Sequence, residues 1–272
     1  MYICLKKTKN EREKMKFKNK VCVITGGANG IGRCIAEQFM AEGAKAAVID
    51  IDKKAGERMA KKYGNERFLF VCGDITKERI LIDFSNKIVK KYKKVDFLIN
   101  NASSFGKRGL LSKCGFDDFN YILMLGATAP YMLAKLFKDK FNKGASIVNI
   151  ASTRAFMSQP DTESYSAAKG AILSLTHALS VSLSGKVRVN SISPGWIDTG
   201  AYHGNGKYMP NYSLSDKKQH SAGRVGKPED IAKTVMFLCG DDAGFITGAN
   251  ITVDGGMTKL MIYHNDYGWK LK

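Results

Sequence analysis

In the stretch VCVITGGANGIGRCIAEQFM, residues 21–40, a strand pattern changes into a helical pattern across a glycine-rich turn, and this change is the strongest indication of the fold. Its first five residues are mostly β-branched, which predicts a buried strand, and apolar residues recur at helical spacing after the glycines. Gly26, Gly30 and Gly32 leave room for a diphosphate, and the helix N-terminus offers free N–H groups to an anion. Three glycines alone are a weak signal, because any tight turn can use them.

Short apolar strands alternate with longer helical patterns along the rest of the chain. The later strands are expected at 46–50, 68–74, 95–101, 145–152, 187–195 and 250–256. The later helices are expected near 53–63, 76–92, 116–140, 163–184 and 228–239. Seven strands alternating with six helices predict an α/β fold, a doubly wound, seven-stranded parallel sheet with helices on both faces in a single domain. Ligands of such a sheet bind beyond the carboxyl ends of its strands.

Length and composition indicate one compact globular domain. The 272 residues are 44% hydrophobic and include five prolines, and the longest apolar runs are strand-sized, so we expect no membrane-spanning segment. Residues 1–15 have no apolar stretch long enough for a signal peptide, which predicts a cytoplasmic protein with a flexible N-terminal extension. Six scattered cysteines without metal-ligand spacing predict free thiols and no metal.

The formal net charge of +18 permits two interpretations. One is binding to nucleic acid or another polyanion, and the other is a lysine-rich solvated surface. The lysines are spread along the chain without arginine–aromatic clusters, which favours the solvated surface and no nucleic-acid partner. Anionic cofactors and substrates would still be attracted to such a protein.

Acidic residues follow the second and third expected strands. Asp50 is placed where a carboxylate can accept hydrogen bonds from an adenosine ribose, although a helix N-cap would use the same residue. Such a carboxylate repels a ribose 2′-phosphate and favours NAD over NADP, while Arg33, Lys53 and Lys54 could offset that repulsion. Asp74 is placed either to reach the adenine or to serve as a solvated turn residue.

The segment NIASTRAFMSQPDTESYSAAKG, residues 149–170, carries a hydroxyl, a phenol and an ammonium in a fixed order. Tyr165 and Lys169 share one helix face, where the ammonium would lower the pKa of the phenol from its reference value of ~10. Tyr165 would then be the general acid/base of an alcohol–carbonyl couple, with Ser152 hydrogen-bonding the substrate oxygen. The alternative is a chance pattern on a surface helix.

Together these motifs resemble the short-chain dehydrogenase/reductase family, NAD(P)-dependent enzymes with a Rossmann fold. The resemblance runs from about Lys16 to about Gly256 and rests on TGGANGIG (25–32), NNA (100–102), Ser152, YSAAK (165–169) and SPGWIDT (193–199). It implies that residues 16–272 form the enzyme domain. Members of the family are usually dimers or tetramers, so we expect a homotetramer, with a homodimer as the second choice.

The resemblance also assigns roles to individual residues. It implies Ser152, Tyr165, Lys169 and Gly126 as catalytic positions, with Lys169 also holding the nicotinamide ribose. Ile197 and Thr199 would bind the carboxamide. The full set of implied cofactor contacts is Gly26, Asn29, Gly30, Ile31, Asp50, Asp74, Ile75, Asn101, Ala102, Tyr165, Lys169, Pro194, Gly195, Ile197 and Thr199.

Two positions depart from the family pattern. Ser103 replaces the last glycine of NNAG, which constrains the turn beside the cofactor. Gly126, in LGATAPY, stands where the family has an asparagine thought to act through its backbone carbonyl on a proton-relay water. Glycine keeps that carbonyl and tolerates a local helix distortion, so we expect an active site. A degenerate, non-catalytic Rossmann protein is the competing interpretation.

The substrate side is less determined by the sequence. Arg154 would meet an anionic or hydroxyl-rich substrate, or else form a rim salt bridge with Asp161 or Glu163. Gln159 and Tyr202 are further candidate substrate residues. The stretch 200–213 suits a mobile lid that Tyr202, His203 and Tyr208 would line, with no role for His203 in hydride transfer, and the tail beyond Gly256 could pack near the cleft or on a neighbouring subunit.

These features favour an NAD-dependent oxidoreductase acting on a secondary alcohol or ketone. The substrate would be a small polyhydroxylated or acidic molecule such as a sugar, sugar acid or polyol. A hydroxysteroid or 3-oxoacyl thioester reductase of the same family is one alternative. A catalytically weakened nucleotide-binding or regulatory protein is the other.

Overall fold

A computed structural model of the chain describes residues 15–106, 109–204, 208–261, 263 and 265–266. Seven parallel strands form one sheet in the order β3-β2-β1-β4-β5-β6-β7. The strands are β1 (Val21–Thr25), β2 (Lys45–Asp50), β3 (Phe68–Cys72), β4 (Val95–Asn100), β5 (Phe141–Ile150), β6 (Val187–Pro194) and β7 (Asn250–Val253). The predicted doubly wound parallel sheet is confirmed. The predicted N-terminal extension lies outside the described residues, apart from Met15.

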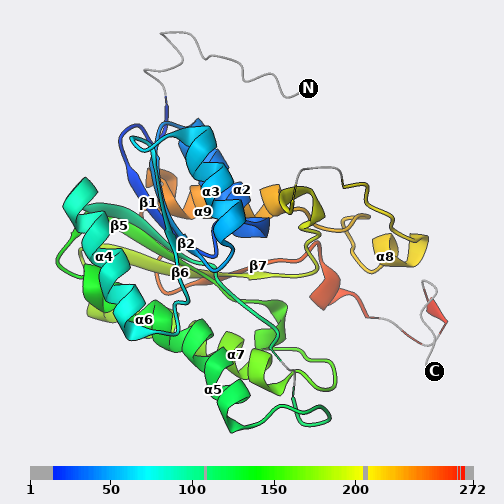
Figure 1. Ribbon diagram of the computed structural model, residues 1–272. Helices are drawn as coiled ribbons and strands as arrows, with labels where there is room; N and C mark the ends of the chain where they lie inside the picture. The colour runs from blue at the N-terminus through cyan, green and yellow to red at the C-terminus, as the bar shows by residue number, and fades with distance from the viewer. Residues whose placement is uncertain (1–14, 107–108, 205–207, 262, 264, 267–272) are drawn as a thin grey trace.

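Helices cover both faces of the sheet (Figure 1). One layer contains α2 (Gly30–Ala41), α3 (Lys53–Tyr63) and α9 (Pro228–Cys239). The opposite layer contains α4 (Glu78–Tyr92), α5 (Phe116–Leu123), α6 (Ala129–Phe137) and α7 (Glu163–Ser182). Each layer has its own hydrophobic core, built around Phe39 on the first face and around Phe84 and Phe137 on the second.

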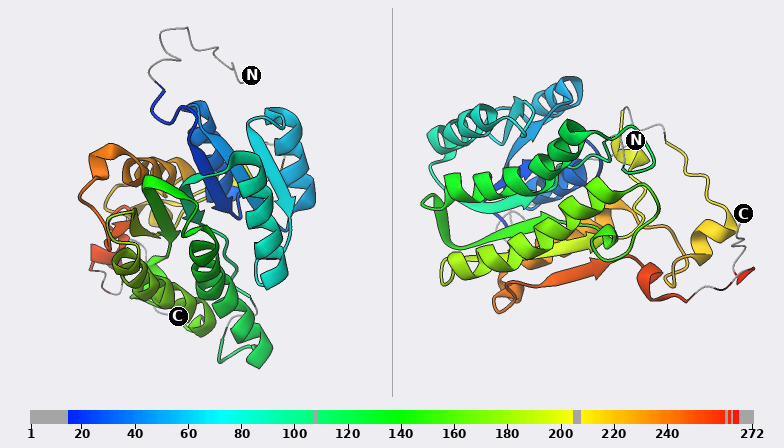
Figure 2. Two further views of the ribbon diagram at one scale, coloured as in Figure 1. Left: turned by 90° about the vertical axis from the view of Figure 1, so that its left-hand side faces the viewer. Right: turned by 90° about the horizontal axis from the view of Figure 1, so that it is seen from below.

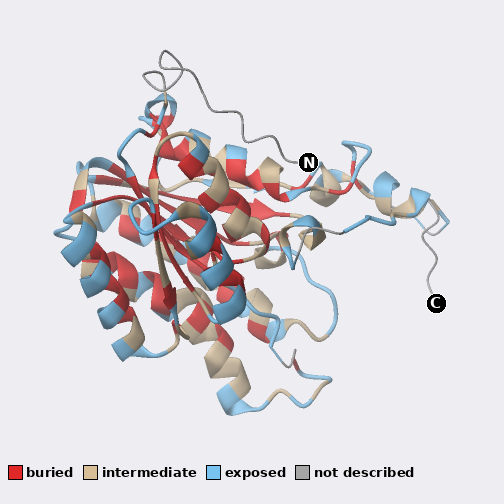
Figure 3. Cartoon of the chain, turned by 45° about the horizontal axis from the view of Figure 1, so that its top comes forward, coloured by how far each residue is buried: buried red, intermediate tan, exposed pale blue. Residues whose placement is uncertain are grey.

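The central strands are buried on both faces, which explains their composition. Every residue of β1 and β4 is buried, and Figure 3 shows the sheet enclosed between helices whose outer faces are exposed. A strand covered on both sides reads as a continuous apolar run, without the alternation of a half-exposed strand. The prediction of a buried strand from the run VCVIT is therefore confirmed.

The helix predicted at 116–140 differs from the structure in a way that bears on the site. It is divided into α5, a π-helical turn η1 (Met124–Thr128) and α6, and it ends at Phe137. The following strand, β5, begins at Phe141, four residues before the expected start. A π turn inserts an extra residue into the helix, and such insertions are often found at functional sites. Gly126 lies at the centre of this turn.

The segments beyond the carboxyl ends of the strands carry the predicted site. They include the 3₁₀ turns η2 (Thr153–Ala155) and η3 (Gly200–Tyr202) and the short helix α8 (Leu214–Lys218). Figures 1 and 2 show α8 standing away from the body of the molecule, on the side of the C-terminus. Two further 3₁₀ turns, η4 (Asp241–Ala243) and η5 (Met257–Lys259), flank β7. Across the described part of the chain, no helix has the length and apolar character needed to cross a membrane.

Candidate active site

The glycine turn between β1 and α2 is closed against the end of β4. Gly26 has a φ of +64°, and a Cβ atom placed on it would lie 2.8 Å from the Cα of Ala102. Glycine is needed for both the conformation and the close approach. The Asn101 side-chain nitrogen donates to the carbonyls of Thr25 and Gly26 at 3.1 and 2.9 Å. The predicted cofactor residues Gly26, Asn101 and Ala102 therefore meet beside the N-terminus of α2.

Asp50 belongs to this turn and not to the start of a helix. Its carboxylate accepts the backbone N–H groups of Ala28 and Asp52, both at 2.9 Å. The N-cap of α3 is Asp52, which accepts the N–H of Ala55 and the side-chain amide of Asn29. These hydrogen bonds hold the pKa of Asp52 below its usual value. The alternative that Asp50 is only a helix cap is therefore wrong, and two carboxylates flank the glycine turn.

Two of the three cations weighed as partners for a 2′-phosphate are engaged with glutamates. Arg33 Nε lies 3.3 Å from the carboxylate of Glu37, one turn further along α2. Lys53 lies 3.9 Å from Glu57 on α3, in an exposed pair of little energetic weight. The expectation that Arg33 and Lys53 could offset the repulsion of a 2′-phosphate by Asp50 is weakened accordingly.

Asp74 and Ile75 follow β3 on the next loop. Asp74 accepts the backbone N–H and the hydroxyl of Thr76, both at 2.9 Å, so it organises its own turn. The Ile75 side chain is buried in the core of the second layer. Neither observation tests whether Asp74 contacts an adenine, so that contact stays a prediction.

Thr199 and His203 lie directly beside Gly30. The Thr199 hydroxyl is 3.2 Å from His203 Nε2, and both residues approach to 3.5 Å of a Cβ placed on Gly30. Thr199 was predicted to contact the cofactor, whereas His203 was expected only to line the lid. The structure adds the imidazole of His203 to the surroundings of the glycine turn. Only its position four residues after Thr199, one turn further along the chain, could have indicated this.

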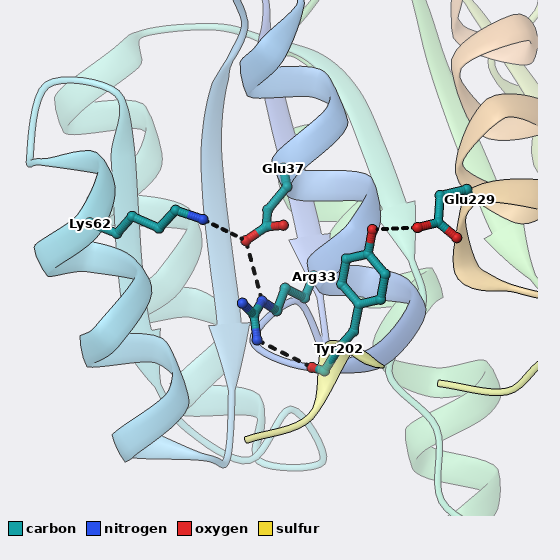
Figure 4. A network of polar contacts seen from close by, with 5 residues as sticks. All are labelled: Arg33, Glu37, Lys62, Tyr202 and Glu229. Atoms are coloured by element: carbon teal, nitrogen blue, oxygen red, sulfur yellow. Dashed lines mark hydrogen bonds and ion pairs between the residues drawn. The ribbon is translucent and has the colours of Figure 1, made fainter. Parts of the chain in front are cut away.

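Tyr202 is bonded to two helices, and its role as a substrate residue stays a prediction. Its hydroxyl donates to the Glu229 carboxylate of α9 at 2.8 Å, and its carbonyl accepts from Arg33 of α2 at 3.4 Å. Figure 4 shows this network, in which the Glu37 carboxylate also accepts a hydrogen bond from Lys62 Nζ at 3.3 Å. Burial raises the pKa of the Tyr202 phenol. Tyr202 therefore fixes η3 to α2 and α9, and this anchor holds the following His203 near the glycine turn.

Ser152, Tyr165 and Lys169 converge where β5 ends and α7 begins. Lys169 Nζ donates to the Ile150 carbonyl at 2.8 Å and lies 5.4 Å from the centre of the Tyr165 ring. This bond ties the first turns of α7 to the end of β5, two residues before Ser152. Burial lowers the pKa of Lys169 to about 8. The three predicted catalytic side chains are thus gathered at one sheet edge.

The pKa of Tyr165 differs from the sequence expectation. Burial raises it above its ordinary value, and the hydroxyls of Ser152 and Ser103 and the charge of Arg154 only partly oppose this effect. The expected lowering by Lys169 is therefore wrong for this arrangement, in which the ammonium is bonded to the carbonyl of the strand.

Phe105, which the sequence analysis did not identify, lies against the phenol. Its ring is stacked on that of Tyr165, with 4.4 Å between centroids and 22° between planes. With 58% of its surface exposed, Phe105 is available to contact a bound substrate on its outer face. The signal was its place just after the NNA motif, beside Ser103. Ser103 itself reaches Tyr165, so this departure from the family pattern adds a hydroxyl to the site.

Gly126 has a packing role that the sequence did not reveal. A Cβ atom at this position would lie 2.8 Å from the Cβ of Ala168 on α7. Real side chains essentially never approach so closely, so any larger residue at 126 requires a shift of α5–α6 against α7. Ala168 directly precedes Lys169, and the π turn therefore lies against the part of α7 that carries this lysine.

Arg154 and Gln159, the remaining candidate substrate residues, pair with each other. Arg154 Nη2 donates to the Gln159 amide oxygen. A salt bridge from Arg154 to Asp161 or Glu163, the alternative from the sequence, is not found among the described residues. Both acids instead accept backbone N–H groups of the loop 109–111.

The segment after β6 is tethered at Asp198. Gly195 at its start donates to the Val253 carbonyl at 3.1 Å, beside Pro194 at the end of β6. Asp198 accepts the hydroxyls of Tyr208, at 2.7 Å, and of Tyr212. These bonds fasten the predicted lid next to Ile197 and Thr199. Residues 205–207 of that lid lie outside the described residues.

The described part of the chain contains neither a disulfide nor a cluster of metal ligands. The five described cysteines are free thiols, and burial raises the pKa of Cys22, Cys34 and Cys239. Within the described ranges, no three His, Cys, Asp or Glu side chains are grouped as metal ligands would be.

Comparison with known proteins gives a consistent result along nearly the whole chain. A family model described as enoyl-(acyl carrier protein) reductase matches residues 26–258. An uncharacterised oxidoreductase of Thermotoga maritima is 42% identical over 255 residues, covering 91% of this chain and 99% of that protein. The meso-2,3-butanediol dehydrogenase of Serratia marcescens is 34% identical over 252 residues, covering 90% of this chain and 96% of the other.

A solved structure is similar to the same extent. An apo SCOR enzyme from Clostridium thermocellum matches with a TM-score of 0.84 and 43% sequence identity. The match covers 93% of this chain and 98% of that one.

Proposed function

We propose that this chain, which belongs to the short-chain dehydrogenase/reductase family of oxidoreductases, transfers a hydride between NAD(H) and a secondary alcohol or ketone. The observation that carries the proposal is the convergence of Ser152, Tyr165 and Lys169 at the carboxyl end of β5. The glycine turn after β1 lies at the same edge of the parallel sheet. A dinucleotide extended along this edge would place its reactive ring beside the three side chains.

The residues of the turn fit a dinucleotide. The close approach of Gly26 to Ala102 leaves a smooth backbone surface, and the N-terminus of α2 favours a negatively charged diphosphate. Asp50, at the end of β2, would accept hydrogen bonds from ribose hydroxyls. When bound, NAD supplies the hydride acceptor of the reaction.

The chain's own residues handle the substrate oxygen and its proton. Ser152 would hold the oxygen by a hydrogen bond, and Tyr165 would remove the hydroxyl proton in oxidation or return it in reduction. Because burial raises the pKa of Tyr165, its ionised form needs positive charge nearby. Arg154 supplies positive charge that lowers this pKa, and the hydroxyls of Ser103 and Ser152 stabilise the phenolate by hydrogen bonds.

NAD is the proposed cofactor, with NADP as the second candidate. Asp50 and Asp52 would both repel a 2′-phosphate, and Arg33 is engaged with Glu37 and the Tyr202 carbonyl. The proposed substrate is a small polyhydroxylated or acidic molecule, because the hydroxyls of Ser152 and Ser103 and the charge of Arg154 act on the phenol. The likeness to a butanediol dehydrogenase supports a secondary alcohol as the reacting group.

A screen for NADH formation tests the proposal. Purified protein would be supplied with NAD and a panel of sugars, polyols, hydroxy acids and hydroxysteroids, and absorbance of NADH would be followed. We expect turnover with a subset of the polar substrates. The competing function, a weakened nucleotide-binding protein, is motivated by Gly126 and the charge of +18. Intact NAD binding without turnover on any panel member would favour that alternative.

A homotetramer remains the proposed assembly, and the cytoplasm remains the proposed location. Apolar side chains are exposed on several helices, as shown by exposures of 46% for Tyr131 on α6, 75% for Val181 on α7 and 41% for Phe237 on α9. Such faces are suited to pairing with a second copy across a two-fold axis. Light scattering at micromolar concentration should give four times the mass of one chain, and a monomer would contradict the assembly.

A further inference from the structure

Arg154 lies beside the proposed reacting centre. Its backbone N–H donates to the Ser152 hydroxyl at 3.2 Å, so both residues belong to the same tight turn at η2. The charge of its guanidinium acts on the Tyr165 phenol, whose pKa it lowers against the effect of burial. The guanidinium is therefore within electrostatic reach of the phenol that would exchange a proton with the substrate.

This guanidinium has no anionic partner among the residues that the structure describes. Nη2 donates to the neutral amide oxygen of Gln159, and Nη1 is buried with no hydrogen-bond partner. The acids nearest in sequence serve elsewhere, because Asp161 and Glu163 accept backbone N–H groups of the loop 109–111 at 2.9 to 3.0 Å. A buried donor without a partner is unfavourable, so the site is arranged to receive an acceptor.

We propose that Arg154 binds a carboxylate of the substrate, so that the substrate is a short-chain hydroxy acid in oxidation and the matching oxo acid in reduction. The proposal rests on the function proposed above. The planar guanidinium presents paired donors that match the two oxygens of a carboxylate. Since Arg154 and Ser152 share one turn, a single small molecule could place its carboxylate on the guanidinium and its reacting hydroxyl on Ser152.

The neutral partner distinguishes a carboxylate from an uncharged polyol. A polyol could be bound by hydrogen bonds alone, and an internal acid beside Arg154 would then satisfy the guanidinium without loss. Gln159 instead orients Arg154 while leaving its positive charge uncompensated. An uncompensated cation next to a buried phenol attracts an anion more strongly than a neutral hydroxyl.

Turnover of matched charged and neutral substrates tests the proposal. The ratio of kcat/KM for 3-hydroxybutyrate to that for its methyl ester would be measured in wild type and variants. We expect a ratio well above one in wild type and a fall of about 100-fold in Arg154→Gln. Arg154→Lys should retain part of the preference, because an ammonium is a point charge without the fork. Exposed Arg79 on α4 provides the matched control, and Arg79→Gln should leave the ratio unchanged.

A second variant keeps Arg154 and changes only its partner. Gln159→Glu would give the guanidinium an internal carboxylate, which should compete with the substrate and lower the same ratio about tenfold or more. This result would separate charge compensation from misfolding, because the arginine and the size of its partner are both kept. An unchanged ratio in both Arg154→Gln and Gln159→Glu would overturn the proposal.

Equilibrium binding separates this inference from the proposed function. Quenching of NADH fluorescence would report binding of straight-chain carboxylates of two to six carbons, and of their amides, to the enzyme–NADH complex. We expect at least one carboxylate to bind about tenfold more tightly than its amide in wild type and about equally in Arg154→Gln. Such a preference without any turnover would support Arg154 while contradicting the dehydrogenase activity. Equal binding of every acid and amide by wild type would overturn the role of Arg154, whatever the turnover.

Discussion

Two loops that leave the carboxyl ends of central strands are held in different ways. The turn after β1 is held through the backbone, since Asn101 donates to the Thr25 and Gly26 carbonyls and Asp50 accepts the Ala28 N–H. The segment after β5 depends more on side chains that contact one another, among them Arg154 with Gln159. Residues 156–160 of that segment are exposed, whereas the glycine turn is mostly buried.

The difference indicates which part of the site can vary. In the turn after β1, the main-chain groups are fixed by hydrogen bonds and close backbone contacts. Such a turn accommodates few ligand shapes, which suits a cofactor of fixed structure. A segment held by exposed side chains can exchange those side chains without disturbing the sheet, which suits substrate selection. The reacting residues lie between the two regions, where Lys169 is bonded to the Ile150 carbonyl at the end of β5. Variants in the turn after β1 should therefore affect cofactor binding, and variants in the segment after β5 should affect the choice of substrate.

The largest effect is expected at the boundary between the regions. Tyr165→Phe removes the proton donor while keeping the ring that stacks on Phe105. Turnover should fall by about 10³-fold or more, with the dissociation constant of NADH close to the wild-type value. Retention of more than a few per cent of the activity would exclude Tyr165 as the acid/base. Steady-state kinetics and fluorescence titration measure the two quantities separately.

The next effect concerns Lys169 and depends on pH. Its pKa is lowered to about 8 in the folded protein from the ordinary value of 10.5, so the unfolded chain binds more protons between these pH values. The buried ammonium thus destabilises the fold below pH 8, and this cost disappears as the pH rises toward 10.5. The difference between these two pKa values corresponds to roughly 3 kcal/mol in the free energy of unfolding.

Urea unfolding of wild type and Lys169→Met measures this effect. The free energy of unfolding of wild type relative to the variant should rise as the pH increases from 8 to 10. A difference independent of pH would mean that Lys169 is not held with a lowered pKa. Exposed Lys87→Met on α4 serves as the control and should show no such trend.

A smaller effect is expected in the cofactor region. Asp50→Ala removes a charged acceptor of ribose hydroxyls, and kcat/KM with NAD should fall about 10- to 100-fold. The kcat/KM with NADP should change less, so the preference for NAD over NADP should become smaller. Asp83→Ala on α4 removes the same charge from an exposed position and should leave both values unchanged. A wild-type preference for NADP would contradict the assignment of Asp50.

The contact between Gly126 and Ala168 predicts an energetic coupling. Gly126→Ala places a Cβ atom 2.8 Å from that of Ala168, and Ala168→Gly removes the obstacle. In a double-mutant cycle, the two substitutions should couple by about 1 kcal/mol in the free energy of unfolding. Strict additivity would show that the helices separate without cost. The contact also indicates that Gly126→Asn, the family residue, would disturb packing next to Lys169.

The smallest effect is expected for His203. His203→Ala should weaken binding of ADP-ribose by a few fold, about the value of one neutral hydrogen bond, because the imidazole lies beside Gly30 and Thr199. Binding of adenosine, which has no diphosphate, should not change. Exposed His177 on α7 provides the control as His177→Ala. Equal weakening of both ligands would assign His203 a structural role only.

The sequence predicted the backbone-held region well and the side-chain-held region poorly. Apolar runs such as VCVIT determine the buried strands, and the strand ends determine where Asp50 and Ser152 lie. The partner of a long side chain depends on its rotamer and on loops distant in sequence. The hydrogen bond of Tyr202 was therefore not predicted, since its partner Glu229 lies 27 residues away on α9. The pKa of Tyr165 was misjudged because burial is not visible in local spacing.

We propose that Tyr165 and its neighbours support transfer of a hydride from a carbinol carbon to NAD. A secondary alcohol deuterated at that carbon, chosen from the substrates that wild type oxidises, tests it directly. The NADH formed should carry deuterium at C4 of the nicotinamide, on one face of the ring only. Tyr165→Phe should form almost none of this labelled NADH under the same conditions. NADH without deuterium would contradict direct hydride transfer from the carbinol carbon. Labelled NADH formed equally fast by Tyr165→Phe would contradict the role of Tyr165.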